Sequence, residues 1–258
     1  MTTIRLIGPG RAGRALAAAF ADVGYDVPGV VAHGVDLSSA AEGVDALVLA
    51  VPDRSVAAVA ALVRPCPTTV VLHLAGSLGL DVLAPHRRRA SFHPLVPLPA
   101  GDDVARIRLR SGAMFAVAGD PFAVELVRGL GGHPVTVADD QRAAYHAAAC
   151  IAANHVVGLL GQVERVAARA GLGLDIFVGL AAAAVSDVAR LGPAAALTGP
   201  AARGDMATLA RHRAAIDPSE HAAYDAGAAL ACRLAGQAAN SVLIDSDTTC
   251  TEEPTACA

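Results

Sequence analysis

Three glycines follow the first apolar run of the chain at the spacing GxGxxG. Residues 4–8 are typical of a strand and residues 12–24 of a helix, so Gly8, Gly10 and Gly13 fall in the turn that joins them. Glycine here allows a tight turn and lets the backbone approach a pyrophosphate, which the N-terminus of the helix attracts. A tight turn with no ligand is the alternative. The spacing favours a dinucleotide-binding α/β domain.

Apolar runs and helix-like stretches alternate through the first half of the chain. Strands are expected at residues 4–8, 27–33, 45–52, 68–76, 89–95, 114–120 and 133–137, and helices at residues 12–24, 55–63 and 121–131. Repeated βα units with continuous apolar strands predict a parallel, doubly wound sheet of the Rossmann type. The fold class is therefore α/β.

The pattern becomes wholly helical after residue 138. Asp139 or Asp140 is expected to cap a long helix that runs to about Gly171. We therefore predict a Rossmann NADP-binding domain at residues 1–138 and an all-helical domain for substrate binding and dimerisation at residues 139–245. The polar, Thr-rich residues 246–258 are expected to be a disordered tail.

Composition excludes several functions. All 20 basic residues are Arg, so Schiff-base chemistry and catalytic lysines are excluded. A net charge of −4 gives no footprint for a nucleic-acid partner. The five Cys lack a CxxC pair and the nine His lack an HExxH motif, so no metal site is predicted. Free thiols and an N-terminus that enters a strand directly indicate a cytoplasmic protein.

Residues 143–163 are apolar enough to resemble a membrane span. His146, Asn154, His155 and Gln162 interrupt the run, and each would be costly in lipid. The sequence therefore predicts a helix buried at the centre of a domain, with no membrane partner.

The choice of cofactor depends on the end of the second strand. NAD-binding domains usually place an acidic residue there, about 20 residues after the glycines. His33 occupies that position, and the nearest acid is Asp36, beyond a glycine. NADP(H) is favoured over NAD(H), although no Arg stands there to hold a 2′-phosphate.

Two further strand ends carry polar and turn residues. Pro52 and Asp53 follow one strand, and Gly76 and Ser77 the next. Ligands of such sheets bind beyond the carboxyl ends of the strands, although ordinary turns would have the same composition. We assign cofactor binding to Gly8, Pro9, Gly10, Arg11, Ala12, Gly13, His33, Val51, Pro52, Asp53 and Gly76, and substrate binding to Ser77.

Two histidines are candidates for acid–base chemistry. His93 ends a strand in the motif SFHPL, where a structural histidine is the alternative. His146, Cys150 and Asn154 recur at i, i+4 and i+8, which places them on one stripe of the long helix. Satisfied core residues would explain that stripe equally well.

The segment TGPAARGD interrupts an Ala-rich helical pattern. Asp205 is a plausible N-cap for a helix that starts at Met206. Arg203 has the planar guanidinium that suits a substrate carboxylate, although a surface Arg is the alternative. We assign both residues to substrate binding.

Together the motifs GPGRAG, VPD, HLAGS, SFHPL, YHAAA…AAN and GPAARGD give the chain a family resemblance over residues 1 to about 235. It resembles bacterial proteins that join a Rossmann-like NADP-binding domain to a helical domain of long-unknown function. These proteins belong to the superfamily of 6-phosphogluconate and prephenate dehydrogenases, pyrroline-5-carboxylate reductase and ketopantoate reductase. Some members are linked to ketopantoate reduction, and the resemblance implies that role here.

The resemblance also suggests residue roles. The hydroxyacid dehydrogenases and the usual ketopantoate reductases carry a catalytic Lys four residues before an Asn, and Cys150 stands there in this chain. His146, one turn earlier, can deliver a proton into the same cleft, directly or through His93. Asn154 would orient the carbonyl oxygen. The segment around His93 resembles that of prephenate dehydrogenases, and Ser77 matches their serine only loosely.

The expected function is an NADPH-dependent oxidoreductase that reduces a small 2-keto acid, with ketopantoate (2-dehydropantoate) first. The alternatives are an imine reductase similar to pyrroline-5-carboxylate reductase, an enzyme similar to prephenate dehydrogenase, and a non-catalytic NADP-binding sensor. The apolar helical domain suggests a homodimer.

Overall fold

The computed structural model describes residues 1–32, 34–99 and 102–236. The chain forms two compact units, Met1–His155 and Val156–Ala258. The division falls later than the predicted boundary after residue 138, because the first part of the long helix contacts the sheet. His33 and the predicted tail at residues 246–258 lie outside the described residues.

The first unit contains one seven-stranded sheet in the order β2-β1-β3-β4-β5-β6-β7. Its strands, which run close to the predicted ranges, are β1 (Ile4–Ile7), β2 (Val30–Val31), β3 (Ala46–Leu49), β4 (Val70–His73), β5 (Arg89–Pro94), β6 (Met114–Gly119) and β7 (His133–Thr136). The α/β fold is confirmed.

The sheet is not wholly parallel. Strands β1 to β5 are parallel, but β6 pairs with β5 in the antiparallel sense, with Pro94 opposite Phe115, and β7 is parallel to β6. The prediction of a parallel sheet was wrong at β6. An apolar run looks the same in either direction, so the sequence pattern carries no sign of this reversal.

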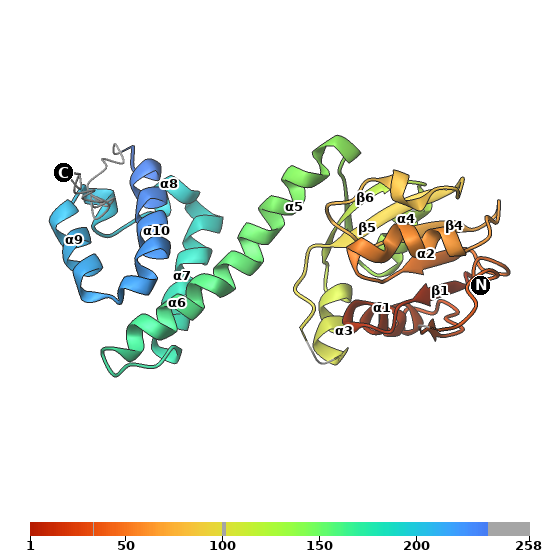
Figure 1. The fold of residues 1–258 in the computed structure, drawn as a ribbon, viewed down its shortest axis with the longest axis horizontal. Helices are drawn as coiled ribbons and strands as arrows, with labels where there is room; N and C mark the ends of the chain where they lie inside the picture. Colours follow the sequence, from red (N-terminus) through yellow and green to blue (C-terminus); the bar gives the residue numbers. More distant parts are fainter. Residues whose placement is uncertain (33, 100–101, 237–258) are drawn as a thin grey trace, which may run out of the picture. The chain divides into compact units, whose positions relative to one another are not determined.

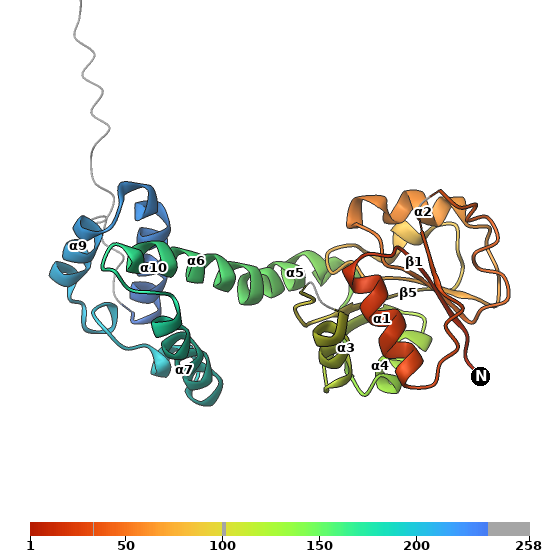
Figure 2. The same cartoon turned by 90° about the horizontal axis from the view of Figure 1, so that it is seen from below.

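Helices cover both faces of the sheet (Figures 1 and 2). Helices α1 (Arg11–Asp22), α3 (Asp102–Arg110) and α4 (Phe122–Gly129) contribute to the core on one face, where the rings of Phe92 and Phe115 stack at 6.2 Å. Helix α2 (Val56–Leu62) and the short 3₁₀ helix η2 (Leu80–Leu83) cover the other face. Helix α3 was not predicted, because its charged sequence buries only Ala105 and Leu109.

Strand β1 lies between β2 and β3, so the chain connections leave it in opposite directions. Such a switch point opens a crevice at the carboxyl ends of the two diverging strands. The glycine turn follows β1, and Ala50 to Asp53 follow β3. The topology therefore brings these two segments to the same edge of the sheet.

One long helical segment follows β7. It begins with the 3₁₀ turn η3 (Asp139–Gln141) and continues as α5 (Arg142–Cys150), a π-helical turn η4 (Ile151–His155) and α6 (Val156–Ala168). The expected cap was wrong, because neither Asp139 nor Asp140 bonds the helix end. The Asp139 carboxylate instead accepts the Leu80 N–H at 2.9 Å and a hydrogen bond from Arg142.

By length and composition alone, the helix Asp139–Ala168 could cross a membrane, which is weak support for a span. The prediction that it is buried at the centre of a domain was wrong. None of its most apolar window is buried within the described chain, and Val157 is 71% exposed.

The second unit is helical throughout its described residues, as predicted. It contains α6, α7 (Asp175–Leu191), α8 (Pro193–Ala196), η5 (Ala201–Arg203), α9 (Met206–Ala215), η6 (Pro218–Glu220) and α10 (His221–Leu234). Ala201, Leu209 and Cys232 form its small buried core. Many other apolar side chains are exposed, among them Leu180 and Val185 on α7.

Candidate functional site

The glycine turn between β1 and α1 is closely packed at two of its three glycines. A Cβ on Gly8, where φ is +108°, would lie 2.4 Å from the Ala50 carbonyl oxygen. A Cβ on Gly13 would lie 2.0 Å from the Gly8 carbonyl oxygen. Only glycine fits these positions, which fixes the tight turn and the close approach of helix to strand.

Gly10 differs, because a Cβ there would meet no atom within 4 Å. It is the N-cap of α1, a helix that has no side-chain cap and no acidic residue in its first turn. The first N–H groups of such a helix have no intrahelical partner and attract anions. An open glycine at an uncapped helix end fits the pyrophosphate of a dinucleotide. Pro9, Arg11 and Ala12 belong to the same turn.

The segment after β3 lies at the same edge of the sheet. Val51 is half-buried, while Pro52 and Asp53 are exposed. The Ser77 hydroxyl is 3.5 Å from Asp53 Oδ2, which is at the limit for a hydrogen bond. The sequence thus correctly predicted that the ends of β3 and β4 lie together.

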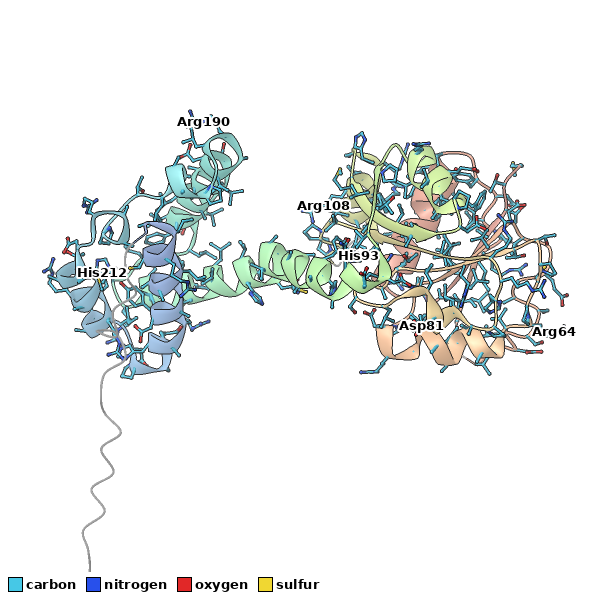
Figure 3. All side chains as sticks on the ribbon, turned by 90° about the horizontal axis from the view of Figure 1, so that it is seen from above. Arg64, Asp81, His93, Arg108, Arg190 and His212 are labelled. Atoms are coloured by element: carbon cyan, nitrogen blue, oxygen red, sulfur yellow. The ribbon has the colours of Figure 1, made fainter. Side chains whose placement is uncertain are left out.

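Two imidazoles and a phenol converge beyond the carboxyl ends of β4 and β5. The His93 ring, at the end of the sheet beside α5 (Figure 3), lies edge-on to the His146 ring at 5.6 Å. His93 Nδ1 is 2.6 Å from the hydroxyl of Tyr145. Gly76 is buried against the pair, since a Cβ there would lie 2.3 Å from His146 Cδ2 and 3.1 Å from His93 Nε2. We call His93, Tyr145, His146 and Gly76 the imidazole cluster.

Burial holds His93 and Tyr145 in their uncharged forms. Burial is the main cause that lowers the pKa of His93 to about 4, and the nearby His146 and Arg142 lower it further. Asp53 acts in the opposite direction. Burial also raises the pKa of Tyr145 to about 12. At neutral pH, His93 is a neutral imidazole and Tyr145 keeps its proton.

Two buried polar side chains, Arg142 and His73, lie next to the imidazole cluster. Arg142 is fully buried and donates to Ser91 Oγ on β5 and, at 3.3 Å, to Asp139. His73 is also fully buried, and its Nε2 lies 3.2 Å from the Gly79 carbonyl oxygen. Arg142 Nη1 and His73 Nδ1 have no partner among the described residues. Arg142 therefore ties the start of α5 to the sheet.

Sequence reasoning missed Tyr145, Arg142 and His73. Tyr145 directly precedes His146 in the quoted motif, and Arg142 lies four residues before His146, on the same face of the helix. The four-residue spacing between Arg142 and His146 could therefore have indicated that Arg142 lies near the site. No local pattern indicates that the phenol of Tyr145 reaches β5.

The predicted stripe His146–Cys150–Asn154 is confirmed only in its first half. Cys150 Sγ is 3.9 Å from His146 Nδ1. Asn154 is exposed and lies in the π-helical turn, where the wider turn breaks the α-helical register. Its role in orienting a carbonyl stays a prediction.

Arg203 and Asp205 belong to the second unit. The Asp205 carboxylate accepts the Thr208 N–H at 3.0 Å and the Thr208 hydroxyl at 2.7 Å, so it is the N-cap of α9. The structural alternative from the sequence thus accounts for Asp205. Arg203 is exposed at the end of η5, and its substrate role stays a prediction.

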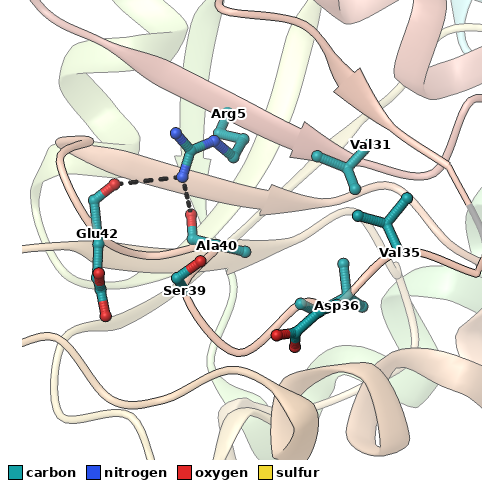
Figure 4. A pocket seen from close by; sticks show the side chains of 8 residues that line it. Arg5, Val31, Val35, Asp36, Ser39, Ala40 and Glu42 are labelled. Carbon is teal, nitrogen blue, oxygen red and sulfur yellow. Dashed lines mark hydrogen bonds between the residues drawn. The ribbon is translucent and has the colours of Figure 1, made fainter.

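A cavity of about 330 Å³ lies beside β2, where the link to β3 forms no helix (Figure 4). Arg5 spans it and donates to the carbonyl oxygens of Ala40 and Glu42. Asp36 lines the same cavity, and its carboxylate accepts the N–H and the hydroxyl of Ser38. The acid nearest to the end of β2 is thus held by its own loop.

No group of three or more His, Cys, Asp or Glu side chains in the described part of the chain could hold a metal ion. The polar groups of the site are the imidazoles of His93, His146 and His73, the phenol of Tyr145 and the guanidinium of Arg142.

Comparison with known proteins supports the fold. A family model described as a domain of unknown function, DUF2520, matches residues 115–230. No curated protein matches the chain. A structure from Bacteroides fragilis, described as that of a provisional NADP oxidoreductase, is 19% identical, with a TM-score of 0.74 over 90% of this chain and 98% of that one.

Two more distant structures share the fold. A pyrroline carboxylate reductase from Plasmodium falciparum, solved with NADP, is 14% identical, with a TM-score of 0.61 over 91% of this chain and 97% of that one. A reductive aminase from Aspergillus terreus, solved with NADPH, is 16% identical, with a TM-score of 0.60 over 95% of this chain and 90% of that one. The chain is thus similar to Rossmann-fold proteins with a helical C-terminal part.

Proposed function

We propose that this protein is an NADPH-dependent oxidoreductase that reduces the carbonyl group of a small 2-keto acid, with ketopantoate as the first candidate substrate. The observation that carries the proposal is the imidazole cluster, which lies at the carboxyl edge of the same sheet as the open glycine turn. The first would supply protons and the second would hold a pyrophosphate.

The glycine turn supports a dinucleotide, and three observations favour NADPH. Asp36, the acid nearest to the end of β2, lies five residues beyond Val31 and already accepts two hydrogen bonds from Ser38. The reductive aminase and the pyrroline carboxylate reductase were solved with NADPH and NADP respectively. The protein from Bacteroides fragilis is described as a provisional NADP oxidoreductase. When bound, the reduced nicotinamide supplies a hydride to the carbonyl carbon.

The residues of this chain then have to complete the reduction. The carbonyl oxygen gains negative charge, and the imidazole cluster holds N–H groups that can bind and protonate it. Gly76 packs directly against the His93 and His146 rings, and because it has no side chain both rings can approach its backbone. In this proposal Arg203 binds the substrate carboxylate, and Arg203→Ala should raise KM more than it lowers kcat.

Imine reduction is the second candidate, because two of the solved relatives are a pyrroline carboxylate reductase and a reductive aminase. An imine nitrogen that is already protonated needs little help from a general acid. Substitution of the imidazole cluster would therefore slow ketone reduction much more than imine reduction.

The test compares substrates on one preparation of the full chain. NADPH oxidation is followed with ketopantoate, with a shorter 2-keto acid and with a cyclic imino acid, and each reaction is repeated with NADH. We expect saturable turnover with ketopantoate and a preference for NADPH. In His146→Ala, kcat for the keto acid should fall while the Kd for NADPH stays constant. Turnover of the imine alone would replace the first candidate with the second, and cofactor binding without any turnover would favour a sensor.

We also propose that two copies of the chain cover the exposed apolar helices of the second unit. Val157, Leu159, Leu180 and Val185 are each at least half exposed, and a single chain rarely leaves so much apolar surface in water. A lipid partner fits less well, since His155 and Gln162 interrupt the apolar run.

A further inference from the structure

The hydrogen bond between Tyr145 and His93 is the shortest contact that links α5 to β5 within the imidazole cluster. The two atoms are 2.6 Å apart, and the rings meet edge-on at 5.7 Å and 86°. Among the described residues, Nδ1 is the one hydrogen-bond partner of the Tyr145 hydroxyl, so it is the one acceptor there for the phenolic O–H. This arrangement favours the phenol as donor and Nδ1 as acceptor.

This direction decides which nitrogen of His93 carries the proton. A neutral imidazole has one N–H and one lone pair, so an Nδ1 that accepts from Tyr145 leaves the proton on Nε2. Nε2 lies beside Gly76 and has no hydrogen-bond partner among the described residues. His93 Nε2 is not fully buried, because it is absent from the buried side-chain atoms that lack a hydrogen-bond partner. A proton on Nε2 is thus a donor with no acceptor among the described residues, at an atom that keeps some exposure to solvent.

We infer that Tyr145 is a positioning residue for His93: its hydroxyl fixes the Nε2–H form of the imidazole and refills Nδ1 when Nε2 gives its proton to the substrate. The inference rests on the proposed function for its chemical step. It makes His93, rather than His146, the residue that protonates the substrate oxygen.

The proton balance explains why a second group is needed. A neutral imidazole that loses its one N–H proton becomes an imidazolate anion, so by itself it is a very weak acid. If the Nε2–H bond breaks while an O–H bond forms on the substrate, the Tyr145 O–H bond can break and Nδ1–H can form in the same step. His93 then stays neutral, and the negative charge moves to the phenolate. After the product leaves, water gives a proton to Nε2, and Nδ1 returns its proton to the Tyr145 phenolate, which restores the starting form.

The groups around His93 support this route over donation from an imidazolium. His146 and Arg142 on α5 and His73 on β4 all disfavour a positive charge on His93, and Asp53 at the end of β3 opposes them only in part. The low pKa of His93, about 4, leaves few imidazolium ions at neutral pH. Burial raises the pKa of Tyr145, and the positive charge of Arg142 opposes that rise in part, so the phenolate forms only as the proton moves to Nδ1.

The first test needs neither substrate nor cofactor, so it can fail independently of the proposed function. Nitrogen NMR of the full chain with labelled histidine reports the tautomer of each ring, and His93→Gln identifies the His93 signals. We expect His93 to hold its proton on Nε2 alone in the unsubstituted protein and to populate both tautomers in Tyr145→Phe. A proton on Nδ1, or a tautomer that Tyr145→Phe leaves unchanged, would overturn the inference.

Tyr224 provides a matched control. Its hydroxyl is 3.1 Å from His212 Nδ1 and the rings meet edge-on at 6.3 Å, so the chain contains a second pair of the same type. Tyr224→Phe should leave the His93 signals and the turnover unchanged. A His93 signal that responds equally to both substitutions would reflect a general change in the fold and would count against the inference.

The second test uses the accepted substrate. Tyr145→Phe should lower kcat by roughly 10- to 100-fold with little change in KM, since a positioned general acid contributes about 10²–10⁴-fold. Without the phenol, His93 can donate only as an imidazolium, so the rate of Tyr145→Phe should fall steadily as pH rises above 5. The unsubstituted protein should keep a level rate up to about pH 8. If Tyr145→Phe lowers kcat but the rate stays constant as pH rises, the transfer of the Tyr145 proton to Nδ1 would be contradicted.

Discussion

A methyl group would have opposite consequences at Gly10 and Gly13, although the two glycines lie only three positions apart. At Gly13 it would overlap the Gly8 carbonyl oxygen at 2.0 Å, so the backbone would have to move. At Gly10 it would enter open space. Gly13 is therefore needed for the fold, whereas Gly10 is needed only if a ligand occupies the open space beside it.

Gly10→Ala should therefore separate folding from cofactor binding. We expect a loss of no more than about 1 kcal/mol in the free energy of unfolding, the scale of a weakened N-cap, and a rise of at least about tenfold in the Kd for NADPH. Fluorescence titration with NADPH and urea denaturation measure the two quantities. Gly227→Ala, another glycine in open space, is the control and should leave the Kd unchanged. Unchanged affinity in Gly10→Ala would remove the pyrophosphate from this turn.

His73 should make the stability of the first unit depend on pH. Burial is the main cause that lowers its pKa to about 4 from an ordinary 6.5. Between these values the unfolded chain takes up a proton that the folded chain resists, so stability is full above pH 6.5 and is lost as pH falls toward 4. The loss should reach roughly 3 kcal/mol. Urea denaturation at several pH values should show a smaller pH effect in His73→Gln, and identical slopes would contradict the assignment.

At the scale of secondary-structure elements, the site depends on how α5 is attached to the sheet. Arg142 joins the helix to Ser91, and Asp139 joins it to the Leu80 N–H of η2. These contacts hold Tyr145 and His146 against β5. The π-helical turn begins directly after α5, at the last residues of the first unit.

Arg142→Met should test this attachment. The substitution keeps most of the buried volume but leaves Ser91 without its donor and Asp139 without its charged partner, which should cost roughly 1–3 kcal/mol of stability. Turnover should fall further than stability alone explains, because the imidazole cluster loses its support. Arg106→Met on α3, where the side chain is partly exposed, is the control. Full activity with lowered stability would make Arg142 purely structural.

Much of this arrangement could be predicted from the sequence. The glycine spacing, the apolar runs and the strand ends correctly located β1, α1 and the edge where Asp53, Gly76 and His93 meet, because these signals are local. The antiparallel direction of β6, the burial of Arg142 and the contact of Tyr145 with His93 depend on residues about 20 to 50 positions apart, so no local pattern encodes them. The π-helical turn at Asn154 also lacks a local signal, since its composition suits an ordinary α-helix.

At the scale of the whole molecule, the exposed apolar helices are the feature that a single chain leaves unexplained. Ile176 and Leu180 stand one turn apart on α7 at 58% and 69% exposure, and Val185 is 62% exposed. Interfaces of obligate homodimers resemble a domain core cut in half, which fits such a surface.

Leu180→Glu should therefore shift a dimer toward monomers in sedimentation velocity. Leu62→Glu on α2, at 61% exposure, introduces the same charge on the first unit and should leave the dimer intact. An unsubstituted protein that sediments as a monomer at micromolar concentration would contradict the homodimer. If that monomer also floated with lipid vesicles, a membrane would be the partner instead.

The central claim is that this chain transfers hydride from NADPH to the carbonyl carbon of a small 2-keto acid. The most direct measurement incubates the purified protein with ketopantoate and NADPH deuterated at its hydride position, followed by mass spectrometry of the product. The account predicts a hydroxy acid with one deuterium on the former carbonyl carbon, formed by the unsubstituted protein and strongly reduced in His93→Gln. A protein that binds the labelled NADPH tightly but yields no deuterated product from keto acids would contradict it.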